Sequence, residues 1–377
     1  MTFKVSKVSP VIIPSDIPVS RSAPRPIDKR QSDYVQKFDY KTIFYDIYQS
    51  GEKVRFSGPP LFNLESAVKF AKVSLFGRER FDSIEISHLW KTQRSFINLN
   101  RAEATQSRDS SFEFNLGKLE ISGLIQPDEN HLFRGKKMLL TMSKDNDLSW
   151  IRDWATFYNK CHGIDAVLIY DNGSKSYSHE ELLETLHAVE GIEAAVVVDW
   201  PFIYGPGGTG AGTWDSDFCQ YSALEHARYR FAQDAAAVVS VDIDELVVVE
   251  GEKTLIEHLE NSESGALLFD GRWILNVSEN NNFPPKFTDY LYYDPRVAAA
   301  TKKWVLNPSR LPENSQWIVH GFTGKFVADT PEEVSHRHFV GVNSDWKKDR
   351  TTRIPFDATK HVLDKHLEES LAIAFNV

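Results

Sequence analysis

The segment from Ala235 to Glu245 constrains the fold more than any other part of the chain. Its apolar residues are small or β-branched, which predicts a buried strand, and the segment ends on Asp242, Asp244 and Glu245. Ligands of open α/β sheets bind beyond the carboxyl ends of the strands, where this strand would place its acidic side chains. The segment therefore predicts an α/β protein with a binding site at that edge of the sheet.

Asp242 and Asp244 are two residues apart, so an extended backbone points both side chains to the same side. Carboxylate oxygens suit Mg²⁺ or Mn²⁺, and such an ion can carry a substrate diphosphate. The Asp-x-Asp pattern also occurs at residues 145–147 and 215–217, but neither copy ends a buried-strand pattern. We therefore expect Mn²⁺ or Mg²⁺ at Asp242 and Asp244.

The rest of the chain divides into four parts by composition and pattern. Residues 1–35 are rich in proline, serine and basic residues, which predicts an extended or loosely attached arm. Short alternating segments over 36–135 predict a small β-rich module of antiparallel strands. Helices alternate with apolar strands over 136–350, which predicts a mixed, mostly parallel sheet flanked by helices. Residues 351–377 carry an amphipathic helix, expected from Ala358 to Phe375.

The overall charge excludes one large class of function. The chain has 53 acidic and 43 basic residues and a formal charge of −10, which argues against a general nucleic-acid binder. No segment approaches the roughly 18 apolar residues of a membrane span, and the N-terminus has no signal-peptide core. The two cysteines have no metal-type spacing, so we expect a reducing compartment and a cytoplasmic protein.

A series of short motifs occurs along residues 137–350 in the order of one known family. The motifs are Lys144–Leu148, Ile151–Trp154, Gly163–Asp165, Ile169–Ser174, Gln220–Tyr221, Ala227–Arg228, Val241–Glu245, Arg272–Trp273, Lys303–Trp304, Asn307–Pro308, His320–Gly321 and His338–Phe339. The series resembles the family-92 glycosyltransferases of the A-type (GT-A) fold. Two motifs depart from that family's pattern: its Lys-Asn-Glu is altered here to Lys144–Asp147, and its Glu-Trp to Asp153-Trp154.

The resemblance implies a metal-dependent glycosyltransferase of the hexosyltransferase type. Such an enzyme would move a sugar from a nucleotide-sugar donor, with a UDP-sugar favoured, to a glycan hydroxyl in polysaccharide or glycoconjugate synthesis. Peripheral contact with a membrane would fit that role. The residues expected to bind the donor are Lys144, Arg152, Asp171, Asp242, Trp273 and Lys303. The expected metal ligands are Asp242, Asp244, His338 and His320, with His338 ranked above His320.

The catalytic base is left open between two carboxylates. Inverting transfer needs a base near the acceptor hydroxyl, whereas retaining transfer does not. Asp270, which follows the predicted strand Ala266–Phe269, and Glu279 are the candidates. Two other assignments have structural alternatives: Trp273 either stacks on a sugar or packs in the core, and Asp171 begins a sequence that also forms ordinary turns.

Two other functions fit parts of the pattern. A phosphatase of the haloacid-dehalogenase type would use Asp242 as its nucleophile, although Leu246 stands where that class has Thr or Val. A catalytically degenerate protein would bind carbohydrate without turnover. The glycines between Gly205 and Gly212 contain the string of a dinucleotide fingerprint, but they do not join a strand directly to a helix, so we expect a loop there.

Overall fold

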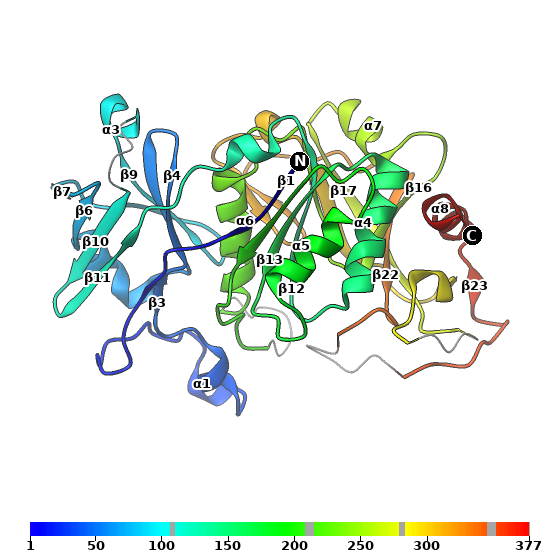
Figure 1. The fold of residues 1–377 in the computed structure, drawn as a ribbon. Coiled ribbons are helices and arrows are strands. Elements are labelled where there is room, and N and C mark those ends of the chain that lie inside the picture. Colours follow the sequence, from blue (N-terminus) through cyan, green and yellow to red (C-terminus); the bar gives the residue numbers. More distant parts are fainter. Residues whose placement is uncertain (106–109, 208–214, 279–282, 345–351, 377) are drawn as a thin grey trace.

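The computed structural model describes residues 1–105, 110–207, 215–278, 283–344 and 352–376. Its centre is a nine-stranded mixed sheet (Figure 1). In spatial order the strands are β1 (Thr2–Ser6), β14 (Ala194–Asp199), β13 (Ala166–Asp171), β12 (Lys137–Ser143), β15 (Ala237–Ser240), β19 (Ala300–Leu306), β17 (Ala266–Ile274), β22 (Val334–Phe339) and β16 (Glu245–Val249). The strands from β1 to β15 are all parallel, as are β17 and β22, and the other neighbouring pairs are antiparallel.

Helices cover both faces of this sheet. One face packs against α4 (Leu148–His162), α5 (His179–His187), α7 (Leu255–Glu260) and α8 (Lys365–Phe375), and the other packs against α6 (Phe218–Arg230). Local signals fix the helix ends: the Asp147 side chain caps the start of α4, and Gly163 ends it in a left-handed conformation. The expected fold class, a mixed and mostly parallel sheet flanked by helices beside a smaller β-rich module, is confirmed.

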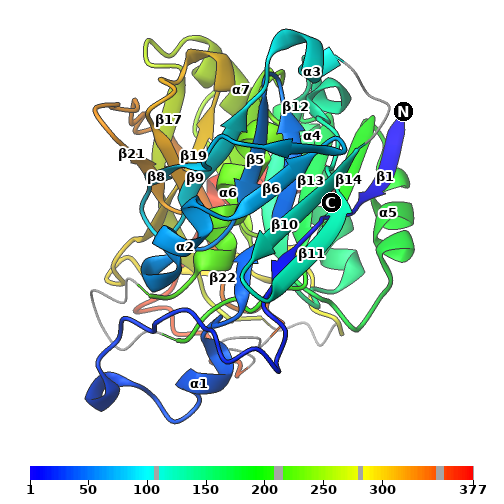
Figure 2. The ribbon, with the colours of Figure 1, turned by 90° about the vertical axis from the view of Figure 1, so that its left-hand side faces the viewer.

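The β-rich module contains two four-stranded antiparallel sheets that share one apolar core. The first sheet has the order β4 (Asp46–Ser50), β5 (Lys53–Ser57), β9 (Gln93–Asn98) and β8 (Glu85–His88). The second has the order β11 (Leu119–Leu124), β10 (Ser111–Leu116), β6 (Lys72–Leu75) and β7 (Arg78–Arg80). The view in Figure 2 shows these sheets in front of α6.

Shorter elements complete the described chain. The two-stranded pairs are β2 (Val11–Ile12) with β3 (Thr42–Phe44), β18 (Tyr292–Tyr293) with β23 (Val362–Leu363), and β20 (Gln316–Ile318) with β21 (Gly321–Thr323). Three short α-helices are α1 (Tyr34–Lys37), α2 (Glu65–Lys69) and α3 (Arg101–Thr105). No helix in the described ranges has the length and apolar character needed to cross a membrane.

Both ends of the chain differ from the sequence-based expectation. Residues 2–6 do not form part of a loose arm, because they pair in parallel with β14 at the edge of the main sheet. The C-terminal helix begins at Lys365 rather than at Ala358. Its start is set by Asp364, whose side chain accepts a hydrogen bond from the Leu367 amide, while Val362 and Leu363 form β23.

Buried polar and charged side chains attach the module to α6. Asp46 on β4 accepts hydrogen bonds from His226 and Arg230, both at 2.9 Å, and all three side chains are almost completely buried. Arg94 on β9 donates to Glu225 at 2.6 Å. Buried ions keep their charges only when they are paired, so these contacts fix the module's position on the helix.

His162, at the end of α4, should make the protein less stable in mild acid. Its Nε2 donates to the Val247 carbonyl at 2.8 Å, and its Nδ1 accepts from the Leu255 amide at 3.4 Å, an arrangement that suits the neutral ring. Burial lowers the pKa of His162 to about 4. The unfolded chain takes up this proton near pH 6.5, so stability falls as the pH drops below that value.

Between pH 6.5 and pH 5 the expected loss from this residue is about 2 kcal/mol. Urea unfolding of the wild type and of His162→Gln at pH 7 and pH 5 isolates this contribution. The wild type should lose about 2 kcal/mol more than the variant over that interval. Equal losses in the two proteins would show that His162 is not held neutral by the fold.

Candidate functional site

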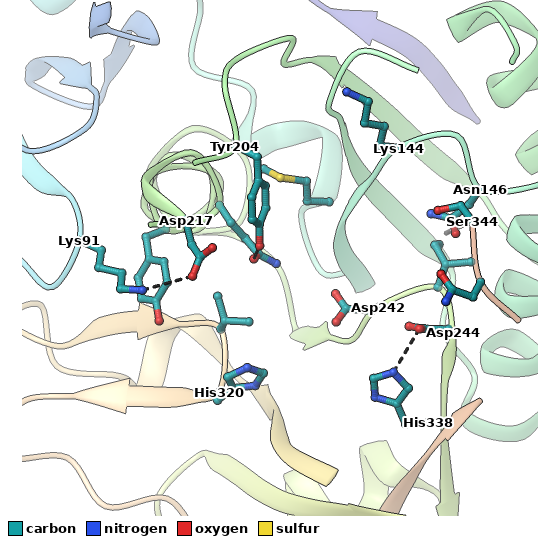
Figure 3. A pocket seen from close by; sticks show the side chains of 16 residues that line it. Lys91, Lys144, Asn146, Tyr204, Asp217, Asp242, Asp244, His320, His338 and Ser344 are labelled. Carbon is teal, nitrogen blue, oxygen red and sulfur yellow. Dashed lines mark hydrogen bonds and ion pairs between the residues drawn. The ribbon is translucent and has the colours of Figure 1, made fainter. Parts of the chain in front are cut away.

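A large cavity lies where the direction of strand addition reverses. From β12 the chain adds β13 and β14 on one side, and it then places β15 on the other side of β12. Such a switch point leaves a crevice at the carboxyl ends of the strands, which is the usual ligand site of open α/β sheets. A cavity of about 440 Å³ occupies this position (Figure 3). It is lined by Lys91, Met142, Lys144, Asn146, Tyr204, Asp217, Gln220, Tyr221, Asp242, Ile243, Asp244, Val319, His320, His338, Asn343 and Ser344.

Asp242 is held at the cavity floor by a buried lysine. The Lys303 Nζ lies 2.5 Å from Asp242 Oδ2 and 3.0 Å from Glu245 Oε2. The Asp242 amide also donates to Glu245 Oε2 at 2.9 Å, which closes the turn between β15 and β16. Burial alone would lower the pKa of Lys303, but Asp242 and Glu245 raise it above its ordinary value, so Lys303 stays charged.

Glu245 is the buried centre of a wider charge network. Its Oε1 lies 3.2 Å from His338 Nδ1 and 3.8 Å from His336 Nδ1. Burial by itself would raise the pKa of Glu245, but Lys303 and the two histidines hold it well below its usual range. The carboxylate is therefore ionised and holds Lys303 and His338 beside the cavity.

Asp244 and His338 face each other across neighbouring strands. Glu245 on β16 pairs in register with His338 on β22, and His338 Nε2 lies 3.1 Å from Asp244 Oδ2. Burial would lower the pKa of His338, but Asp244 and then Glu245 raise it to about 10, so the ring is an imidazolium. The Trp273 ring covers the other side, with its centroid 4.2 Å from that of His338 and an interplanar angle of 35°.

The acidic and histidine side chains of the cavity include possible ligands for a divalent cation. Asp242, Asp244 and His338 offer two carboxylates and an imidazole to one cavity, a donor set that suits Mn²⁺ or Mg²⁺. Within the ranges that the structure describes, no three His, Cys, Asp or Glu side chains converge as a ready metal site. Asp242 is paired with Lys303, and Asp244 with His338. The residue types fit a metal, provided that an ion shared by Asp244 and His338 displaces the proton on His338 Nε2 and with it the hydrogen bond between the two side chains.

The structure brings some of the predicted site residues together in the cavity. Lys144, Asp242, Asp244, His320 and His338 line it, and Lys303 lies directly beneath Asp242. His320 Nδ1 donates to the Lys302 carbonyl at 3.0 Å. Desolvation and the charge of Lys303 lower the pKa of His320, so its ring is neutral and its Nε2 is available as a ligand atom.

Two of the residues predicted to bind the donor lie elsewhere. Arg152 is exposed on α4 and pairs with its neighbour Asp153 at 3.0 Å. Asp171 is buried and its carboxylate is used within a turn, where it accepts from the Ser174 amide at 3.0 Å and contacts His179 at 3.1 Å. The turn interpretation of this motif therefore describes its geometry, and neither residue lines the cavity.

Of the two residues predicted as the catalytic base, only Asp270 lies within the described residues. Asp270 is exposed and pairs with Lys302 at 2.9 Å outside the cavity. The strand does not end at Phe269 but continues to Ile274 through a register shift between Phe269 and Gly271, and this irregularity turns Asp270 outward. Glu279 lies outside the described residues, as do most of the glycines of the 205–212 segment.

Several cavity residues were not predicted from the sequence. Lys91 comes from the turn between β8 and β9 of the N-terminal module, and its Nζ lies 3.2 Å from Asp217 Oδ2. Asp217 belongs to an Asp-x-Asp copy that we had set aside, and it precedes α6 with a left-handed backbone (φ +63°). No periodicity in the sequence links residue 91 to residue 217, so only the tertiary structure shows this pair.

The fold and the cavity together define an open α/β protein with a ligand-type cavity at its topological switch point. The sequence matches no protein-family model and no curated protein.

Comparison with solved structures gives distant similarities. The S. aureus TarS 1-349 structure has 12% sequence identity and a TM-score of 0.30 over 64% of this chain and 71% of that chain. The galactosyltransferase LgtC with donor and acceptor sugar analogs has 16% identity and a TM-score of 0.25 over 46% and 58%. The WbbM bifunctional glycosyltransferase has 12% identity and a TM-score of 0.25 over 41% of this chain and 27% of its own length. At these values the similarities support no argument about activity, which therefore rests on the cavity itself.

Proposed function

We propose that this chain is a metal-dependent glycosyltransferase of the A-type fold that moves a sugar from a nucleotide donor, with a UDP-sugar favoured, to a glycan hydroxyl. The observation that carries the proposal is the position of Asp242 and Asp244 at the switch-point cavity, beside His338 and opposite Lys144. A role in cytoplasmic polysaccharide or glycoconjugate synthesis, with peripheral membrane contact, is part of the same proposal.

In this proposal each cavity residue has its own role in binding the donor. Asp242, Asp244 and His338 would hold Mn²⁺ or Mg²⁺, with His320 as a further candidate ligand. The ion would offset the charge of the diphosphate as the sugar leaves. Lys144, at the end of β12, would bring a cation to the nucleotide side of the cavity. Lys303 would hold Asp242 in place from below rather than contact the donor, because it is buried against Asp242 and Glu245.

Asp217 takes the role that the sequence suggested for Asp270. It is the described carboxylate that lines the cavity in addition to Asp242 and Asp244, and about one third of its side chain is exposed. If the reaction inverts configuration, Asp217 is placed to accept the proton of the acceptor hydroxyl. Asp217→Asn should then lower the rate of sugar transfer in a steady-state assay, whereas donor binding should persist.

One observation favours a second candidate, a degenerate protein that binds carbohydrate without turnover. Lys303 already neutralises Asp242, and no ready three-ligand site occurs among the described residues. Such a protein would bind donor or glycan without a metal requirement and would release no nucleotide.

A thermal-shift screen distinguishes the two functions. UDP-, GDP-, dTDP- and CMP-linked sugars would each be tested with and without Mn²⁺, on the wild type and on Asp244→Asn. A ligand at a hundred times its dissociation constant stabilises the folded chain by about 2.7 kcal/mol. We expect a shift that requires Mn²⁺, occurs with one nucleotide class and is absent in Asp244→Asn. A shift that is independent of Mn²⁺ would favour the degenerate binder, and no shift with any donor would contradict the proposed function.

A further inference from the structure

A second cavity of about 380 Å³ lies beside the first, between the N-terminal module and the start of α6. Lys91 lines both cavities, so they meet at the turn between β8 and β9. Small-molecule sites typically have volumes of about 300–1,000 Å³ and lie preferentially between domains, as this cavity does. The proposed binding of the nucleotide-sugar donor does not involve this second cavity.

The wall of the second cavity combines an exposed aromatic ring with polar groups. Trp90 is 49% exposed, although its backbone is fixed, because the Gln316 side chain accepts from its amide at 2.8 Å and donates to its carbonyl at 2.7 Å. A rigid, flat ring of this kind can pack against the C–H face of a sugar.

A polar side chain of the same wall lacks a partner. Gln93 is 4% exposed and lines the second cavity, and its Nε2 finds no hydrogen-bond acceptor among the described residues. A buried donor left without an acceptor is destabilising, so a ligand hydroxyl that reached this amide would supply a hydrogen bond that the described residues do not. Two other polar side chains of this wall, Glu65 and His88, already contact each other at 2.9 Å.

The turn that joins the two cavities has a strained backbone. Lys91 has a φ of +59°, in the left-handed region that a lysine rarely adopts. Strain of this kind persists where the surrounding structure requires it and often marks a ligand site. Here it directs the Lys91 ammonium toward Asp217, with the Nζ 5.2 Å from the centre of the Tyr221 ring.

We propose that the second cavity binds one or two uncharged sugar units of the acceptor, with Trp90 packed against a sugar ring, Gln93 bonded to a hydroxyl and Lys91 at the junction with the donor cavity. The apolar wall and the internally paired charges favour an uncharged glycan over an anionic one. This inference rests on the proposed function, which makes the neighbouring cavity the donor site. It assigns to the N-terminal module the selection of the acceptor.

The test measures glycan binding to the full chain by ligand-observed NMR, with maltotriose, cellotriose and triacetylchitotriose as probes. At least one probe should bind the wild type, and Trp90→Ala should weaken that binding at least tenfold, while Trp90→Phe retains part of it. Phe81→Ala is the matched control, since Phe81 is 93% exposed on the same module and lines neither cavity. Lys91→Gly removes the ammonium without backbone strain and should reduce transfer to the glycan more than hydrolysis of the donor.

Three results would overturn the proposal. One is unchanged binding in Trp90→Ala, another is binding of anionic glycans only, and the third is no binding of any probe to the wild type with an affinity of about 10 mM or better. The donor thermal-shift screen separates this failure from that of the proposed function. If donors raise the melting temperature but Trp90→Ala binds glycans as the wild type does, only the proposed acceptor site is contradicted. If glycan binding depends on Trp90 but no donor raises the melting temperature, the proposed glycosyltransferase function is contradicted.

Discussion

Replacing Asp242 by asparagine should lower the rate of sugar transfer on the order of a thousandfold. The substitution keeps the shape of the side chain but removes the negative charge that we propose for the metal site. The fold should persist, because the Asp242 side chain is 39% exposed and Lys303 keeps a second partner in Glu245. Steady-state transfer assays with a saturating donor, together with urea unfolding, measure the two effects separately.

Asp270→Asn is the matched control for this experiment. It makes the same chemical change on an exposed residue outside the cavity, where the contact that the substitution weakens is the ion pair with Lys302. Its transfer rate should stay within a factor of about two, since exposed pairs contribute little. A large loss of transfer rate in Asp270→Asn would support Asp270, the sequence-based candidate, as the catalytic base. A near-normal transfer rate in Asp242→Asn would contradict the proposed metal site.

Replacing Lys303 by methionine should produce the largest loss of stability. Lys303 is 1% exposed and lies between Asp242 and the fully buried Glu245. Removing one partner of a buried ion pair leaves the other charge uncompensated and typically costs about 3–5 kcal/mol. Urea unfolding at neutral pH should show a loss of this size together with a loss of activity, because Asp242 would no longer be held at the cavity floor.

The neighbouring lysine supplies the control. Lys302→Met removes a cation one position away, but Lys302 pairs with the exposed Asp270, with side chains that are 39% and 62% exposed. We expect a change within about 1 kcal/mol, as for other surface ion pairs. If Lys303→Met is as stable as Lys302→Met, then the network around Glu245 does not support the cavity floor.

The sequence predicted the part of the fold that depends on local patterns. The apolar positions of α4 and the buried strands around it follow regular periods, and the Asp147 and Gly163 caps fix the ends of that helix. The pairing of β1 with β14 has no local signal, because it joins residues 2–6 to residues 194–198. The same holds for the irregularity after Phe269, where Gly271 lets β17 pass close to the His336 ring.

In the candidate site too, some features follow from local sequence patterns and others depend on contacts between distant residues. Asp242, Asp244 and His338 could be placed in one cavity because two of them follow a predicted strand, which ends at Ser240 in the structure, and the third belongs to an ordered series of motifs. The role of Glu245 depends on the register between β16 and β22, which the sequence does not specify. Lys91 and Asp217 meet only because the module packs on α6. The metal, the donor and the catalytic roles stay predictions that the proposed experiments test.

The pairing of Asp46 with His226 and Arg230 has a consequence for how the protein can be divided. The boundary near residue 135 separates two architectures, but the ions that meet across it are almost completely buried. Cutting the chain there would leave Asp46 unpaired in one fragment and Arg230 without that partner in the other, each in a newly exposed apolar surface. We therefore expect the two modules to fold as one unit, so a chimera that exchanges the N-terminal module must also carry an α6 with matching partners.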